Sequence, residues 1–156
     1  MSMRTFAAAL GLATLLGLSL ALGSGQARSA SACTQVNGHL LDEHVEGAQS
    51  VGRMVGSING RYEFTHGPAG GADPNATVLF GTGEARIITN KGELRWHESA
   101  ALDFANEDDY STAVLASLRG GTGAWTGATG HVIMSGFFHP STRTGEFDYR
   151  GEICMP

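Results

Sequence analysis

The side chains best suited to acid–base chemistry concentrate on two adjacent predicted strands, residues 76–89 and 93–98. They are three glutamates, two arginines and a histidine: Glu84, Arg86, Glu93, Arg95, His97 and Glu98. The pattern favours an outer face of cross-strand ion pairs. The alternative places every second member inside a barrel, where burial would tune a carboxylate for proton transfer. Alternation along 93–98 puts Trp96 and Glu98 on one face, which makes Glu98 the inward carboxylate and the candidate catalytic residue.

Metal and nucleotide chemistry is not predicted. His39 and His44 flank Asp42 and Glu43, but their spacing matches no zinc signature, and a solvated acidic loop explains the cluster better. Residues 126–130, TGATG, are followed by a β-forming run instead of the helix that a dinucleotide site requires. No Gly-x-Ser-x-Gly elbow is present. We therefore expect neither a metal nor a cofactor.

The N-terminal residues predict export. Residues 1–32 combine a basic start, an apolar Ala- and Leu-rich stretch and the small-x-small sequence that ends at Ala32, which is typical of a cleaved signal peptide. Residues 33–156 then form a single domain that is secreted or periplasmic. Cys33 and Cys154 are its two cysteines, and an even pair in an exported protein predicts a disulfide. The alternative is a lipoprotein that is acylated and anchored at Cys33.

The charge and hydropathy of the mature chain argue against nucleic acid binding and against a transmembrane helix. After removal of Arg4 and Arg28 with the leader, eight Lys and Arg face 15 Asp and Glu, a net charge of −7. Such a chain lacks the basic stripe that nucleic acid binding needs. No apolar run in the mature part approaches the length of a transmembrane helix.

The mature chain reads as an all-β domain of about eight short strands. Its glycine content works against long helices, and apolar residues alternate with polar ones between turn signals. This pattern predicts a β-barrel or, alternatively, an immunoglobulin-like β-sandwich. The clearest strand patterns lie at residues 51–58, 61–66, 76–89, 93–98, 110–119, 130–139 and 145–154. Residues 67–75 are predicted to form a loop, and residues 101–109 a helical turn or an acidic loop.

The same alternation predicts which aromatic side chains face inward. Trp96 is better buried than exposed because of the apolar surface it removes from water. We expect it to face inward and to contact any ligand, together with four other aromatic residues: Phe64, Phe80, Phe138 and Tyr149. Ile133 and Phe137 lie on the opposite, outer face of their strand, so we expect a loop or a second subunit of a homo-oligomer to cover them.

Residues 120–132, GGTGAWTGATGHV, resemble the GGTG-aromatic-x-GATG motif of the allene oxide cyclase and dirigent superfamily. The C-terminal segment 144–154, TGEFDYRGEIC, is similar to the way those chains end, and residues 51–56 and 60–62 resemble an early strand pair. The chain looks closest to exported bacterial members. The resemblance implies an antiparallel eight-stranded calycin-like barrel, trimeric in many plant members, which cyclise a fatty-acid epoxide or steer the coupling of phenoxy radicals. Asp42, Glu43 and Glu46 do not match the spacing of the cyclase site, so no catalytic residue is carried over.

These observations predict a barrel whose apolar lumen holds one small hydrophobic molecule. One alternative is a cyclase or isomerase that acts in that lumen. The other is a non-catalytic protein that acts through its surface and fills its own lumen with Phe64, Phe80 and Trp96. A polar pair that points into an open lumen would favour the enzyme.

Overall fold

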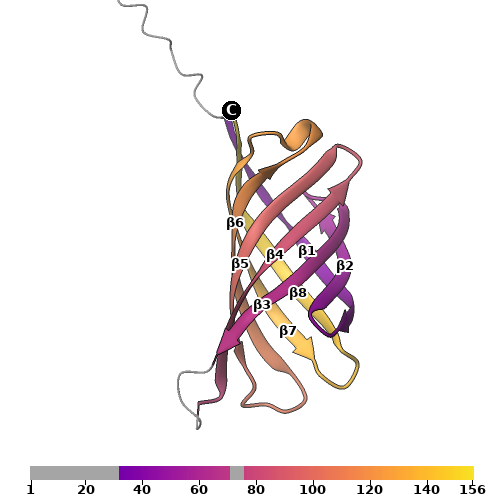
Figure 1. Cartoon of the computed structure of the whole chain (residues 1–156), viewed down its shortest axis with the longest axis vertical. Helices are drawn as coiled ribbons and strands as arrows, with labels where there is room; N and C mark the ends of the chain where they lie inside the picture. Colours follow the sequence, from indigo (N-terminus) through magenta and orange to yellow (C-terminus); the bar gives the residue numbers. More distant parts are fainter. Residues whose placement is uncertain (1–31, 71–75) are drawn as a thin grey trace, which may run out of the picture.

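The computed structural model describes residues 32–70 and 76–156, which form one closed antiparallel barrel of eight strands (Figure 1). The strands follow one another around the barrel in sequence order, and β8 pairs with β1 to close it. Their bounds are β1 Ala32–Glu46, β2 Gln49–Gly56, β3 Gly60–Gly70, β4 Val78–Thr89, β5 Gly92–Asp103, β6 Tyr110–Gly121, β7 Thr129–His139 and β8 Thr144–Met155. The predicted all-β barrel is confirmed, and a sandwich is ruled out by this closure.

The strands form because inward apolar residues alternate with outward polar ones. Along β8 the buried Phe147, Tyr149 and Ile153 alternate with side chains such as Glu146 and Asp148, as the sequence predicts. Because each of the eight described strands has two hydrogen-bonded neighbours, the barrel that they form has no unpaired edge.

One strand was not predicted, and two extend well beyond their predicted limits. The segment that contains His39 and His44 is not a loop but part of β1, the 15-residue strand that joins β2 and β8. β3 continues past a bulge between His66 and Ala69 to Gly70, and β5 continues to Asp103. In β3 and β5 the added residues are mostly glycine, proline, serine and alanine, which hide a strand from a period-two pattern, while in β1 the run of charged residues around Asp42 resembles a loop.

One end of the barrel is filled by side chains. Ile58, Ile87, Leu94 and Ile153 are almost fully buried there, and the short 3-10 helix η1 (Gly123–Trp125) lies against β5 and β6. Trp125 Nε1 donates a hydrogen bond to Thr89 Oγ1 at 3.0 Å, which ties this helix to β4. The barrel therefore has a solid end, and any internal space lies toward the other.

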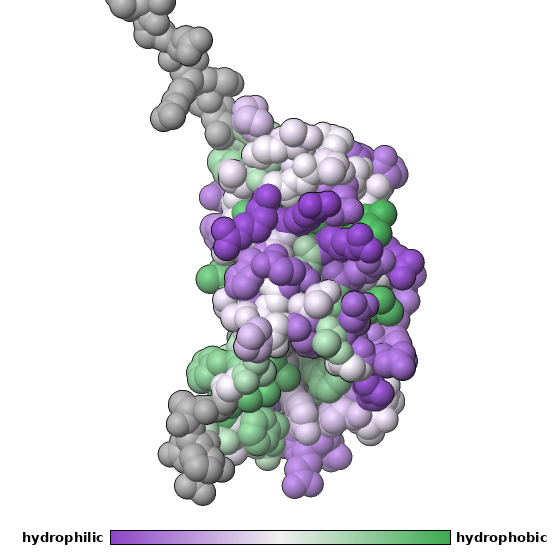
Figure 2. Space-filling view, in the orientation of Figure 1, coloured by the Kyte–Doolittle hydropathy of each residue, from purple (hydrophilic) through white to green (hydrophobic). Residues whose placement is uncertain are grey.

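At the other end, Figure 2 shows a group of hydrophobic residues beside the lower of the two grey segments. Phe80 and Phe104 are 55% and 40% exposed. On the outer face of β6 and β7, Leu115, Ile133 and Phe137 are 48%, 44% and 50% exposed, so nothing in the described part of the chain covers them. Cover by a second subunit stays a prediction.

None of the helical structure in residues 32–70 and 76–156 has the length and hydrophobicity of a membrane span. The predicted signal peptide, residues 1–32, lies almost wholly outside the described residues. Export, signal cleavage and lipid anchoring remain predictions.

Candidate functional site

A cavity of about 300 Å³ occupies the barrel lumen on the side away from η1. An eight-stranded barrel encloses either packed side chains or one small molecule, and this volume is at the lower limit of ligand sites. Partly exposed His66, Gly67 and Ala69 belong to its wall, so the cavity reaches the surface beside the end of β3. The wall is mostly apolar and includes Leu40, Phe64, Leu79, Val114, Met134, Phe138 and Phe147.

Glu98 is a buried acid in this wall. Alternation along β5 turns Leu94, Trp96 and Glu98 inward, and Glu98 is only 3% exposed. Its Oε1 accepts hydrogen bonds from Trp96 Nε1 at 2.6 Å and from the Tyr62 hydroxyl at 3.0 Å. Burial raises the pKa of Glu98 to about 7; the two hydrogen bonds oppose this shift, and the nearby charge of Asp42 adds to it. The sequence prediction of an inward Glu98 is correct in position, while a catalytic role is untested.

Asp42 is the second acid of the lumen, and sequence reasoning missed it. It lies in β1 opposite Gly52, just before the bulge between Asp42 and His44. Its Oδ1 atom is buried and has no hydrogen-bond partner among the described residues. Burial raises the pKa of Asp42 from 3.8 to about 7. The signal was present in the sequence, because Val36, Leu40 and Asp42 share one parity and the first two are buried core residues.

The histidines and acids around Asp42 point outward and pair with one another. His39 Nδ1 lies 2.7 Å from Asp148, and His44 Nε2 lies 3.3 Å from Glu46. The predicted acidic loop is therefore a strand whose outer face carries ion pairs, while Asp42 alone of this cluster lines the cavity.

A third polar group lies where the cavity meets the surface. His66 Nε2 and the hydroxyl of buried Ser50 are 2.8 Å apart, and the His66 ring packs edge-on against Phe64 with centroids 4.6 Å apart. Burial lowers the pKa of His66, which favours the uncharged imidazole at neutral pH.

Four of the five predicted ligand-contact residues face inward, but only two of them line the cavity. Phe64 and Phe138 line the cavity together with Glu98. Trp96 and Tyr149 face inward as expected, but they belong to the packed core; the Tyr149 hydroxyl accepts a hydrogen bond from Ile58 N at 2.8 Å and donates one to Ile58 O at 3.2 Å.

The expectation that Phe80 faces inward is wrong. β4 pairs with β5 without a break from Val78 to Thr89, so its parity never changes. Ala85 and Ile87 are buried, which places the even-numbered Phe80 outside, at 55% exposure. Leu79 and Gly81 line the cavity in its place.

The outer face of β3, β4 and β5 carries the ion pairs that the charge pattern favours. Glu63 contacts both Arg61 and Arg86, Glu93 contacts Arg95, and Glu84 contacts His97. These groups pair with one another on the outer face and lie away from the cavity, which leaves Glu98 as the one member of the cluster inside the barrel.

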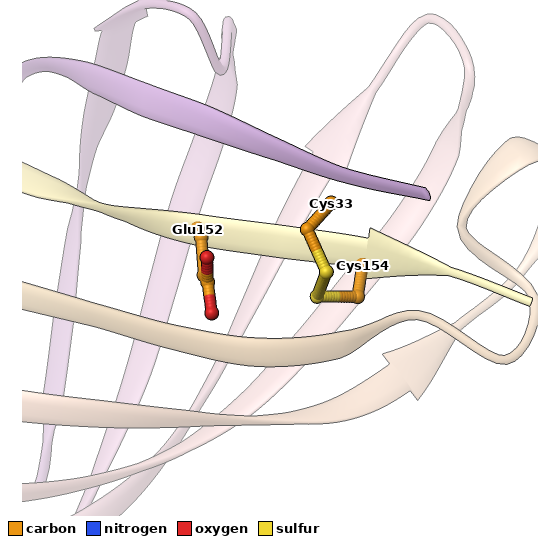
Figure 3. A group of neighbouring side chains, drawn as sticks. All are labelled: Cys33, Glu152 and Cys154. Atoms are coloured by element: carbon orange, nitrogen blue, oxygen red, sulfur yellow. A yellow bond between two sulfur atoms is a disulfide. The ribbon is translucent and has the colours of Figure 1, made fainter. Parts of the chain in front are cut away.

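The predicted Cys33–Cys154 disulfide is present in the structure (Figure 3). The two cysteines are direct partners in the β1–β8 ladder, so barrel closure brings them together across 121 residues of sequence. With Glu152 they form the one group of three metal-ligating residue types found within residues 32–70 and 76–156. Because both sulfurs are bonded to each other, neither offers the thiolate that a metal would need.

Comparisons with known proteins gave structural similarities alone. No family model and no curated protein sequence matches the chain. Among solved structures, the pterocarpan synthase dirigent protein GePTS1 is 12% identical, with a TM-score of 0.34 over 82% of this chain and 87% of that one. The pterocarpan synthase dirigent protein PsPTS1 is also 12% identical, with a TM-score of 0.34 over 79% of this chain and 95% of that one.

Proposed function

We propose that this protein binds one small, mainly apolar molecule in the barrel lumen. The observation that carries the proposal is an apolar cavity of about 300 Å³ that retains an unpartnered buried carboxyl oxygen, Asp42 Oδ1. A barrel that served only as a scaffold would gain stability by filling this space with its own side chains, since cavities and unsatisfied buried polar groups are both costly.

The alternative of a self-filled barrel has less support. That alternative requires Phe64, Phe80 and Trp96 to fill the lumen, whereas Phe80 lies outside and the inward Phe64 and Trp96 still leave a cavity of about 300 Å³. In keeping with this role, we place the mature protein outside the cytoplasm, because its disulfide suits an oxidising compartment.

Nile red, a neutral apolar fluorophore, tests the proposal. We expect saturable binding of one dye per protein, with blue-shifted emission. Ala100→Phe adds a ring to the cavity wall and should weaken binding at least tenfold. Ala113→Phe makes the same change on the exposed face of β6 and should bind as the wild type does. Absence of saturable binding, or equal binding by Ala100→Phe and Ala113→Phe, would contradict a lumen site.

Catalysis in the lumen is the second candidate function, of the cyclase or isomerase type. It is favoured by the two inward carboxyls of Asp42 and Glu98, whose pKa values of about 7 suit a group that gives and takes protons near neutrality. An enzyme of this kind would bind its substrate in the Glu98→Gln variant but convert it at least a hundredfold more slowly. Unchanged turnover in that variant would exclude Glu98 from the reaction.

A further inference from the structure

We infer that the lumen selects lipophilic amines, that is, small apolar molecules with one cationic nitrogen placed against Asp42, and rejects molecules with a carboxylate. This inference rests on the proposed ligand-binding function and adds the chemical class of the ligand.

The charge of the cavity wall favours a cationic ligand. Among the residues that line it there is no lysine and no arginine, while Asp42 enters from β1 and Glu98 from β5. The other titratable groups of the wall are Tyr62 and His66, both from β3. Burial favours the uncharged form of both, so every formal charge that the wall can carry at neutral pH is negative.

The hydrogen bonds of the cavity wall favour a ligand that donates to Asp42. The Tyr62 hydroxyl and the Trp96 indole N–H both donate to Glu98 Oε1. These two donors are therefore already used, and no described residue donates a hydrogen bond to the Oδ1 atom of Asp42. A carboxylate ligand would bring a further negative charge to a wall whose described residues offer it no lysine or arginine, and repulsion from two acids would oppose it.

A cationic amine would supply both the charge and the donor that Asp42 lacks. An ammonium group carries both the positive charge and the N–H donors that a desolvated carboxylate lacks, and such charge-assisted hydrogen bonds are about twice as strong as neutral ones. A hydroxyl group supplies a donor without the charge. We therefore expect the order amine, then alcohol, then carboxylate for molecules with the same apolar chain.

The size of the cavity sets the chain length. A volume of about 300 Å³ equals that of roughly ten water molecules in the liquid. Octylamine, 1-octanol and octanoate each contain eight carbons, fall in this range, and carry an amine, a hydroxyl or a carboxylate at one end. They are the probes for the experiment.

The experiment measures the Kd of each probe for the mature, disulfide-bonded protein by calorimetry at pH 7.5. Octylamine should bind at least tenfold more tightly than 1-octanol, and octanoate should bind more weakly than both. Asp42→Asn keeps the shape of the side chain but removes its charge, and should bring octylamine to within about threefold of 1-octanol. Asp148→Asn, the same change on the outer face of β8, should keep the wild-type order.

A second readout separates binding from a folding defect. Octylamine affinity should rise between pH 6 and pH 8 as Asp42 and Glu98 ionise, and the rise should be clearly smaller in Asp42→Asn, while 1-octanol binding stays flat in both proteins. The inference is overturned if octanoate binds as tightly as octylamine, or if Asp42→Asn retains the amine preference. If neither Nile red nor 1-octanol binds, the proposed function itself fails; if both bind without an amine preference, only this inference fails.

Discussion

At the scale of single residues, the lumen carboxyls show what alternation can and cannot predict. Glu98 could be placed inside because Leu94, Trp96 and Glu98 form an unbroken series of inward positions. Asp42 was missed because it lies among His39, Glu43 and His44, and a run of charged residues resembles a solvated loop. Its orientation depends on pairing with β2 and β8, which are distant in the sequence.

The pKa of Asp42 predicts a pH-dependent stability. Its folded value of about 7 lies above the ordinary 3.8, so its destabilising effect is absent below pH 4, grows between pH 4 and 7, and is complete above pH 7. Asp42→Asn should therefore gain stability relative to the wild type as pH rises from 5 to 8, by about 2–3 kcal/mol in urea unfolding.

Asp108→Asn provides the control, since Asp108 is exposed in the loop between β5 and β6. Its stability relative to the wild type should be the same at pH 5 and pH 8. If Asp42→Asn also shows no change between the two pH values, Asp42 is an ordinary solvated acid and does not face the lumen.

At the scale of the elements, strand parity decides which side chains reach the cavity. The sequence predicts Phe80 on the inner face of 76–89. β4 remains in register with β5 along its whole length, so Phe80 lies outside and Leu79 takes the inward place. The bulges in β1 and β3 likewise shift later residues and could not be located from the sequence, because they arise from pairing between strands.

The corner between β6 and β7 is predicted to depend on its glycines. Gly123 has a φ of +61°, a conformation that favours glycine, and a Cβ on Gly121 would lie 2.1 Å from the Glu93 carbonyl oxygen. Gly121→Val and Gly123→Val should each lower the free energy of unfolding by at least about 2 kcal/mol. Thermal melts followed by circular dichroism will measure the loss.

Gly81→Ala is the matched control for the corner. A Cβ at Gly81 would meet only the Ala69 Cβ at 3.7 Å, an ordinary contact, so its Tm should stay within about two degrees of the wild type. Corner variants that melt as the control does would show that the backbone there tolerates side chains, contrary to the structure.

At the scale of the whole molecule, the barrel has a solid end and a hollow end. The disulfide, η1 and the large aliphatic residues gather at the solid end, where β1 begins and β8 finishes (Figure 1). Strand count and turn spacing predicted about eight strands but left a barrel and a sandwich open, and the closed barrel was expected from the resemblance of residues 120–132 to a known motif. The position of the cavity could not, because it depends on how side chains from several strands share the lumen.

Closure predicts a large effect of the disulfide. The bond joins residues 121 positions apart, for which the loop-entropy relation gives about 5 kcal/mol as an upper value. The Cys33→Ser, Cys154→Ser double variant should keep its circular dichroism spectrum, because the β1–β8 ladder supplies the closing hydrogen bonds, but unfold at markedly lower urea concentration. An unchanged urea midpoint would mean that the two cysteines do not form this bond.

The most direct test of the lumen as a ligand site is an NMR titration of protein labelled with 13C at the methionine methyl groups. Met134 lines the cavity, whereas Met155 lies at the end of β8 beside the disulfide. On addition of Nile red, the Met134 methyl resonance should shift in a saturable manner while the Met155 resonance stays in place. A stationary Met134 resonance at saturating dye, or an equal shift at Met155, would contradict binding in the lumen.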